Sequence, residues 1–189
     1  MRSFAWPKLP PITARNSRAT RSRTLIRDTE RMKTLIAFTT RSLHTEQPRP
    51  FGASIVDTRT GKTLLQALNN VMGEFDPSSH AEVRAIRRAT KKLKNVSLSG
   101  YTLYSTCEPC PMCMSAALWA RVDRVVYGAA IEDANRHFDQ IRIPATEVAA
   151  RSDMPCVVVG PFLRDECYAL FTHPNMLRVM RRWYSRKRK

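Results

Sequence analysis

Two cysteines three residues apart, at the start of an apolar stretch, constrain this chain more than any other feature. They are Cys110 and Cys113 in Thr106-Cys107-Glu108-Pro109-Cys110-Pro111-Met112-Cys113, which follows a β-like run. Side chains at i and i+3 lie on one helix face, and Pro109 fits the first helical position. The free N–H groups and the dipole of a helix N-terminus favour thiolate, the form that binds metal. The pattern therefore predicts half of a metal site at the start of a helix.

A third metal ligand is expected upstream, at His80 in His80-Ala81-Glu82. The preceding Asp76-Pro77-Ser78-Ser79 indicates a turn followed by a helix start. One histidine and two cysteines make three protein ligands, the number typical of catalytic zinc, which keeps a fourth position open for water. Structural zinc is usually closed by four ligands. We therefore predict one Zn²⁺ per chain, bound by His80, Cys110 and Cys113.

Glu82 lies two residues after the predicted histidine ligand. In the first turn of a helix both side chains can address an atom beyond the helix end, so a carboxylate there can carry protons between zinc-bound water and a substrate nitrogen. Each residue also has an ordinary interpretation: His80 as a residue at a helix start, and Glu82 as the acid of a capping box with Ser79. The cysteines downstream favour the functional interpretation, in which Glu82 is the catalytic residue.

Cys107 continues the three-residue spacing and allows an alternative. Three cysteines and His80 could close a structural site, and the chain would then be a zinc-stapled nucleic-acid-binding module without catalysis. We favour the open site because Cys107 ends a strand before Glu108-Pro109, out of phase with the helix that presents the other two thiols.

The charge of the chain is concentrated at its two ends. Its formal net charge is +16, from 32 basic and 16 acidic residues. Met1–Arg27 and Arg178–Lys189 each hold seven basic residues and no acidic one, so the remainder is nearly neutral. Basic ends can bind phosphates, but a nearly neutral body is not expected of a fold-wide nucleic-acid surface. No apolar run approaches membrane-spanning length.

The predicted organisation is a tail followed by one domain. Residues 1–27 are rich in Pro, Ser, Thr and Arg, a composition typical of disorder, and we interpret them as an overlong start, a transit peptide or an RNA-binding arm. Residues 28–189 have the size of a single domain. The five cysteines, three of them within Cys107–Cys113, favour a metal site in a reducing compartment over a disulfide scaffold, and hence a cytoplasmic protein.

Hydrophobic periodicity predicts strands that alternate with helices. Strands are expected at 51–57, 63–68, 101–106, 124–128 and 156–159, and helices at 28–44, 79–93, 110–120 and 163–184. Residues 131–151 are the least predictable part. The pattern indicates an α/β fold, a three-layer α/β/α sandwich around one mixed sheet of about five strands. Ligand sites in such sheets lie at the carboxyl ends of strands, where both halves of the zinc site are predicted.

These motifs resemble the purine branch of the cytidine deaminase superfamily. The similarity extends over 28–184 and is carried by Pro50-Phe51-Gly52-Ala53, Asn69, Asp76–Val83 and Thr106–Cys113. The order H-x-E followed by P-C-x-x-C is the signature of zinc nucleobase deaminases. The resemblance implies hydrolytic deamination of a nucleobase or nucleoside with release of ammonia, in a homodimeric enzyme.

The resemblance also implies a role for each matching residue. His80, Cys110 and Cys113 would bind zinc and Glu82 would shuttle protons. Asn69, Ala81 and Pro109 would bind the substrate. Asn69 has an ordinary alternative, because asparagine also forms turns.

The substrate is the point on which two groups of this superfamily differ. The zinc motifs look most like those of bacterial guanine deaminases, which carry Phe-Asp-Asp where this chain has Phe138-Asp139-Gln140. The terminal segment Leu163–Cys167, with the basic end that follows, is instead similar to tRNA adenosine deaminases. We therefore predict a small purine base or nucleoside, with guanine first. The alternative is adenosine in tRNA, bound through the basic tails.

Overall fold

A mixed β-sheet forms the centre of the computed structural model, which describes residues 18–187, with side chains from 24 to 181. Its strands are β1 (Gly52–Asp57), β2 (Thr63–Leu68), β3 (Tyr101–Cys107), β4 (Arg124–Ala129) and β5 (Val157–Val159). Within the described residues these five strands have the order β2-β1-β3-β4-β5. β1 is antiparallel to β2 and β3, whereas β3, β4 and β5 are parallel. The predicted mixed sheet is confirmed.

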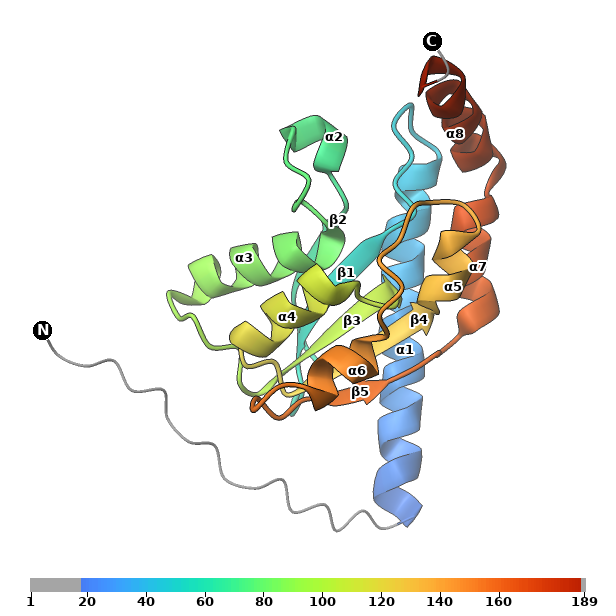
Figure 1. Cartoon of the computed structure of the whole chain (residues 1–189). Coiled ribbons are helices and arrows are strands. Elements are labelled where there is room, and N and C mark those ends of the chain that lie inside the picture. The colour runs from blue at the N-terminus through green and yellow to red at the C-terminus, as the bar shows by residue number, and fades with distance from the viewer. Residues whose placement is uncertain (1–17, 188–189) are drawn as a thin grey trace, which may run out of the picture.

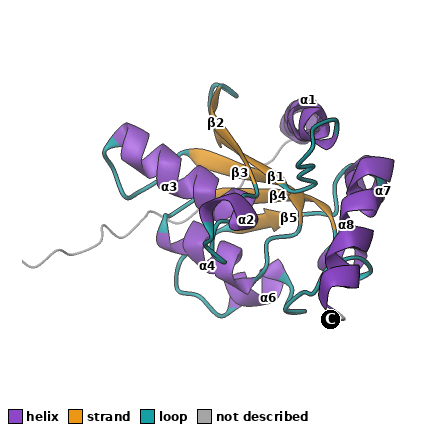
Figure 2. Cartoon of the chain, turned by 90° about the horizontal axis from the view of Figure 1, so that it is seen from above, coloured by secondary structure: helices purple, strands orange, loops and turns teal. Residues whose placement is uncertain are grey.

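Helices cover both faces of this sheet (Figures 1 and 2). One face carries α3 (Ala81–Leu93), α4 (Pro111–Trp119) and α6 (Ala145–Ala150), and the other carries α1 (Arg18–Leu43) and α7 (Arg164–Thr172). The predicted three-layer α/β/α sandwich is therefore confirmed. Among the described residues, no helix combines the length and the apolar character that crossing a bilayer requires.

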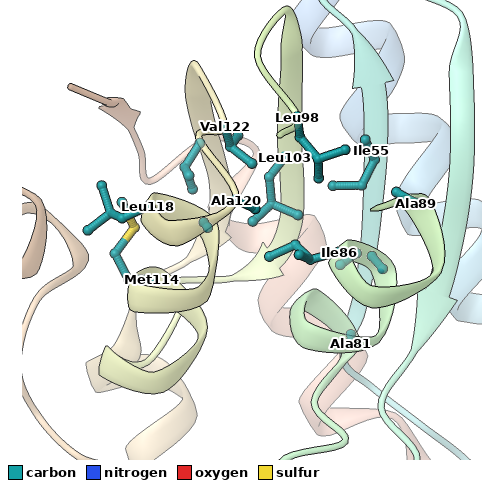
Figure 3. Packing of buried hydrophobic residues seen from close by; sticks show 14 of the residues in the cluster. Ile55, Ala81, Ile86, Ala89, Leu98, Leu103, Met114, Leu118, Ala120 and Val122 are labelled. Carbon is teal, nitrogen blue, oxygen red and sulfur yellow. The ribbon is translucent and has the colours of Figure 1, made fainter. Parts of the chain in front are cut away.

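Alternating side chains of the strands supply the two layers of core. Ile55 and Leu103 point toward α3 and α4, as Figure 3 shows, and belong to one buried cluster. Their chain neighbours Val56 and Tyr104 belong to the cluster under α1 and α7. Successive residues of a strand point to opposite faces, so a strand buried on both faces reads as a continuous apolar run.

α1 packs closely on the sheet at two places. Asp28 is buried, and its carboxylate accepts a hydrogen bond from Tyr104 Oη at 2.6 Å and two from the Arg124 guanidinium at 2.7 Å each. Further along the helix, a Cβ placed on Gly52 would lie 2.1 Å from Thr39 Oγ1. The absence of a side chain at position 52 is therefore what allows this close approach of α1 to β1.

The first helix begins earlier than the sequence predicts. We expected a disordered tail over 1–27 and a helix from residue 28, but α1 starts at Arg18. The predicted helix start at residue 28 is therefore ten residues too late, because the apolar spacing used to locate a helix does not extend into its basic first turns. The expected disorder of 1–17 lies outside the described residues.

The terminal helix is also corrected. A single helix was expected over 163–184, but the structure has α7 and then α8 (Pro174–Lys187), separated at His173. Proline lacks an N–H and disfavours helical geometry in the residue before it. His173 accordingly has an extended backbone, with φ −56° and ψ 135°. Pro174 then begins α8.

Three short helices were not predicted. They are α2 (Val71–Glu74), α5 (Ile131–Asn135) and α6. Each has fewer than two turns, so none contains enough residues to show a helical period in the sequence. α5 and α6 lie within the stretch that the sequence left undefined.

Candidate active site

The Cys110 thiol is placed by the connection between β3 and α4. β3 ends at Cys107, and Cys110 is the N-cap of α4, with an extended backbone at φ −62° and ψ 167°. Pro111, and not Pro109, occupies the first helical position. The assignment of this position to Pro109 is therefore two residues too early, and the expected helix over 110–120 begins one residue before α4. Cys113 follows in the first turn and is buried.

His80 is placed in the same way at the start of α3. It is the N-cap, and Ala81 and Glu82 follow in the first turn. The alternative capping box between Ser79 and Glu82 is wrong. The Ser79 hydroxyl instead donates to Glu74 Oε2 at 2.5 Å, and no side chain caps α3.

Three predicted ligands come together between these two helix starts. The donor atoms of His80, Cys110 and Cys113 all lie within 4.8 Å of one another. His80 Nδ1 is 3.5 Å from Cys113 Sγ and 3.8 Å from Cys110 Sγ. Tetrahedral zinc, with Zn–N of about 2.0 Å and Zn–S of about 2.3 Å, requires N···S separations of about 3.5 Å. The donor set therefore fits zinc. Cys107 does not belong to this group among the described residues.

The electrostatics of the three donors favour a thiolate at Cys110. A hydrogen bond from the Cys113 thiol, reinforced by His80, lowers the pKa of Cys110 to about 4. The same hydrogen bond and burial raise the pKa of Cys113 well above its ordinary value. The hydrogen bond with Cys110 also raises the pKa of His80. The lowered pKa of Cys110 favours the thiolate, the form that binds a cation.

Glu82 lies beside the donor set, in the position predicted for it. Its side chain is buried, with Oε2 3.6 Å from Cys113 Sγ. Oε1 accepts a hydrogen bond from the Ser105 hydroxyl of β3 at 3.0 Å. Burial raises the pKa of Glu82, and a carboxyl with a raised pKa is better suited to take and return a proton near neutral pH.

A cavity of about 170 Å³ opens beside these groups. Its lining includes His80, Glu82 and Cys110, and also Asn69, one of the three residues predicted to bind substrate. Ala81 and Pro109, the other two residues predicted to bind substrate, are buried and do not line it. The remaining lining residues are Phe51, Val71, Cys107, Glu108, Phe138, Asp139 and Gln140.

Some of these lining residues had a sequence signal and others had none. Phe51 and Phe138-Asp139-Gln140 lie in segments that carried the family resemblance or departed from it, but we gave them no role. Glu108 lies in the Thr106–Cys113 motif but was likewise given no role. Val71 and the supporting Ser105 had no signal, because no local spacing shows which residues a cavity or a buried carboxylate will contact. Asn69 is fixed at the end of β2, where its N–H donates to the Phe51 carbonyl at 3.0 Å.

A three-donor metal site beside a buried carboxylate, at helix starts on a mixed α/β sheet, defines the class of zinc-dependent deaminase folds. Residues 26–129 match the cytidine and deoxycytidylate deaminase zinc-binding region. The chain belongs to this family. The resemblance inferred from its motifs is therefore confirmed, and so is the expectation of a zinc-binding region.

The similar proteins include both guanine deaminases and tRNA-specific adenosine deaminases. The chain is 48% identical to a guanine deaminase of Bacillus subtilis over 85 residues, covering 45% of this chain and 53% of that protein. It is 39% identical to a tRNA-specific adenosine deaminase of Buchnera aphidicola over 88 residues, covering 47% and 53%. The chain thus spans about half the length of these curated relatives.

The fold is similar to that of a solved guanine deaminase from Nitrosomonas europaea. The TM-score is 0.69 at 25% identity, over 77% of this chain and 82% of that one. The similarity therefore extends well beyond the zinc motifs, to about three quarters of the chain.

Proposed function

We propose that this protein is a zinc-dependent hydrolytic deaminase of a nucleobase or nucleoside, with a guanine-like purine base as the leading substrate. The observation that carries the proposal is the position of the buried Glu82 carboxylate, 3.6 Å from Cys113 Sγ and on the wall of a small cavity. The guanine deaminase relatives support a purine.

The metal and the Glu82 carboxylate have separate roles in the proposed reaction. Zinc, when bound by His80, Cys110 and Cys113, supplies a Lewis acid that lowers the pKa of water to about 7. Glu82 takes a proton from water and returns protons to the ring nitrogen and to the departing amine. Ser105 holds one oxygen of Glu82, so the other remains directed toward the metal side. In the net reaction water replaces the exocyclic amine, giving an oxo-base and ammonia.

The cavity matches a planar base in size and lining. Its volume of about 170 Å³ is close to the roughly 150 Å³ of a protein cavity that holds one benzene ring. Phe51 and Phe138 offer aromatic surface, and Asn69, Asp139 and Gln140 offer polar groups for a base edge. A sugar would have to lie outside a cavity of this size, so a free base is favoured over a nucleoside.

The proposal is tested by ammonia release from guanine, adenine, cytosine, their nucleosides and a tRNA anticodon stem-loop. We expect the highest kcat/KM on guanine or another aminopurine. Activity confined to cytosine or cytidine, or no ammonia from any of these substrates by zinc-loaded protein, would contradict it.

A second candidate function is the deamination of adenosine in tRNA. It is favoured by the basic ends of the chain and by the tRNA-specific relative. The two candidates are separated by removing residues 1–17 and 186–189. Activity on a free purine should survive this truncation and vary little with salt concentration. Binding of RNA should weaken, and the slope of log K against the logarithm of salt concentration should fall by close to one unit for each lost phosphate contact. Steeply salt-dependent turnover of the stem-loop without ammonia from any free base or nucleoside would favour tRNA.

We further propose that the protein is a homodimer. Trp119, with 62% of its surface exposed, and Ile143 border a groove of about 640 Å³ between α4 and α6. Large exposed apolar side chains beside a groove are typical of interaction surfaces. Light scattering should give twice the 21.6 kDa of the chain, and Trp119→Ser should shift the mass toward one chain. A wild-type mass of one chain would contradict the dimer.

A further inference from the structure

The side chain of Glu108 joins two segments that are distant in sequence. It is buried, and each of its carboxylate oxygens accepts one backbone hydrogen bond. Oε2 accepts from the N–H of Ile131 at 3.1 Å, and Oε1 accepts from the N–H of Ala145 at 2.8 Å. These N–H groups belong to the first residues of α5 and α6, where a helix has no acceptor of its own. One carboxylate thus satisfies the starts of two helices.

The chain between these two contacts borders the cavity. Residues 136–144 contain no regular secondary structure and form the orange loop between α5 and α6 in Figure 1. Within this loop Phe138, Asp139 and Gln140 line the cavity beside His80 and Glu82. Both ends of the segment that supplies one wall of the site are therefore tied to Glu108.

Glu108 is also tied to the metal donors. Only Pro109 separates it from Cys110, and its own N–H donates to the Ala129 carbonyl at 2.8 Å. The preceding Cys107 is paired with Ala129 in the parallel ladder of β3 and β4. A short, hydrogen-bonded peptide thus fixes the separation between a metal donor and the carboxylate that holds the loop.

Other contacts hold only parts of the loop. Asp133 caps α5 and accepts two hydrogen bonds from Arg164, at 2.8 Å and 2.5 Å. The Phe138 ring packs on Phe51 with 5.0 Å between ring centroids. These contacts secure α5 and the middle of the loop, whereas the Ala145 N–H at its far end is satisfied by Glu108. Removing the carboxylate would leave two buried N–H groups without an acceptor.

We propose that Glu108 is a positioning residue that sets purine selectivity, by holding the 136–144 loop at a fixed distance from the metal donors. This inference rests on the proposed deaminase function. The carboxylate acts through the loop: it fixes where Phe138, Asp139 and Gln140 meet the base. Its loss affects the binding and discrimination of substrates more than the proton transfers of Glu82.

The test is Glu108→Gln in the zinc-loaded full chain, with Glu132→Gln as the matched control. Glutamine keeps the shape but replaces one acceptor with a donor that faces a backbone N–H. Glu132 is exposed and lies in the same segment. We expect at least about tenfold faster hydrogen exchange at Ile131 or Ala145 in Glu108→Gln, with zinc content unchanged. KM for guanine should rise at least about tenfold, kcat should change less than about threefold, and the preference among guanine, 2,6-diaminopurine and adenine should narrow. Glu132→Gln should leave all of these unchanged.

Three results would overturn the proposal. One is unchanged exchange at both amides in Glu108→Gln, whatever the activity. Another is loss of zinc in that variant, which would assign Glu108 to the metal site. The third is faster exchange with unchanged KM and selectivity, which would make the contact merely structural. Wild-type protein that releases no ammonia would refute the proposed function instead, and the exchange data would still decide whether Glu108 holds the loop.

Discussion

At the residue scale, the two oxygens of Glu82 have different surroundings. One is hydrogen-bonded by Ser105, and the other faces the Cys113 thiol. Glu82→Gln keeps the shape and an oxygen for Ser105 but cannot exchange protons near neutral pH. We expect turnover to fall at least about a hundredfold, with zinc content and Tm within experimental error of wild type. Steady-state kinetics beside metal analysis and a melting curve checks this, and a variant that retains more than about a tenth of wild-type turnover would exclude a proton-transfer role.

The cysteines offer a matched pair of substitutions. Cys110→Ser removes a donor 3.8 Å from His80 Nδ1 and should strip the metal, whereas Cys107→Ser removes a thiol outside the donor group and should leave it. Wild-type protein should hold about one zinc per chain by elemental analysis. Metal loss in Cys107→Ser alone would support the closed structural site in place of the open one.

The residues predicted from sequence are those whose spacing reflects their chemistry. Cys110 and Cys113 lie at one helix start and His80 and Glu82 at another, so local spacing was enough to predict that each pair points to a common place. Ser105 and Glu108 act on residues 23 positions away or more. Which residues they contact depends on how the strands and helices pack, and a single sequence does not encode that in its local pattern.

At the element scale, α2 and the turn after it are held mainly by carboxylates. The pKa of Glu74 is lowered to about 2, first by the hydrogen bond from the Ser79 hydroxyl and then by those from Arg84 and Asn70. Asp76 binds Ser78 and Arg87 in a similar way. These contacts join the turn to α3 directly beside the cavity.

The lowered pKa of Glu74 makes this contribution pH-dependent. A carboxyl whose folded pKa lies below its ordinary value of 4.5 stabilises the fold fully above that value, and the stabilisation is lost as pH falls toward about 2. Glu74→Gln should therefore lower Tm at pH 6, and its difference from wild type should shrink as pH approaches 2.5. Melting curves at both pH values check this, and a difference that grows in acid would contradict it.

The contact between α1 and β1 gives a second prediction at this scale. A Cβ on Gly52 would meet Thr39 Oγ1 at 2.1 Å but Thr39 Cβ only at 3.3 Å. Gly52→Ala should cost about 1 to 3 kcal/mol through overpacking. Adding Thr39→Ala should recover most of this loss. Denaturant unfolding of the two single variants and the double variant measures the coupling, and additive effects would mean that the two side chains do not clash.

Long elements were predictable and short ones were not. The five strands were located to within one residue at every end, because apolar runs between turn residues define them. The sequence did not predict that the terminal helix divides before Pro174, because the apolar spacing continues on both sides of this proline. α2, α5 and α6 are stabilised by hydrogen bonds of the buried or paired carboxylates Glu74, Asp133 and Glu108, which the sequence period does not report.

At the scale of the whole molecule, Asp28 links the long N-terminal helix to the centre of the sheet. Arg124 in β4 and Tyr104 in β3 both donate to its carboxylate. Asp28→Ala would leave the largely buried Arg124 cation without its partner. We expect a loss of about 3 kcal/mol and a Tm lower by roughly 6 to 12 °C, with zinc content unchanged in the folded protein. A Tm within 2 °C of wild type, by calorimetry, would show that apolar packing alone holds α1.

The zinc donors come from the starts of α3 and α4, which approach each other only when both helices pack on one face of the sheet. An unfolded chain has no such site, so the free energy of metal binding is also free energy of folding. The free energy of unfolding should therefore rise with the concentration of free zinc. The rise is proportional to the logarithm of that concentration divided by the dissociation constant of the site. Stoichiometric zinc in any variant then reports that the layer formed by α3 and α4 has assembled, even where catalysis is lost.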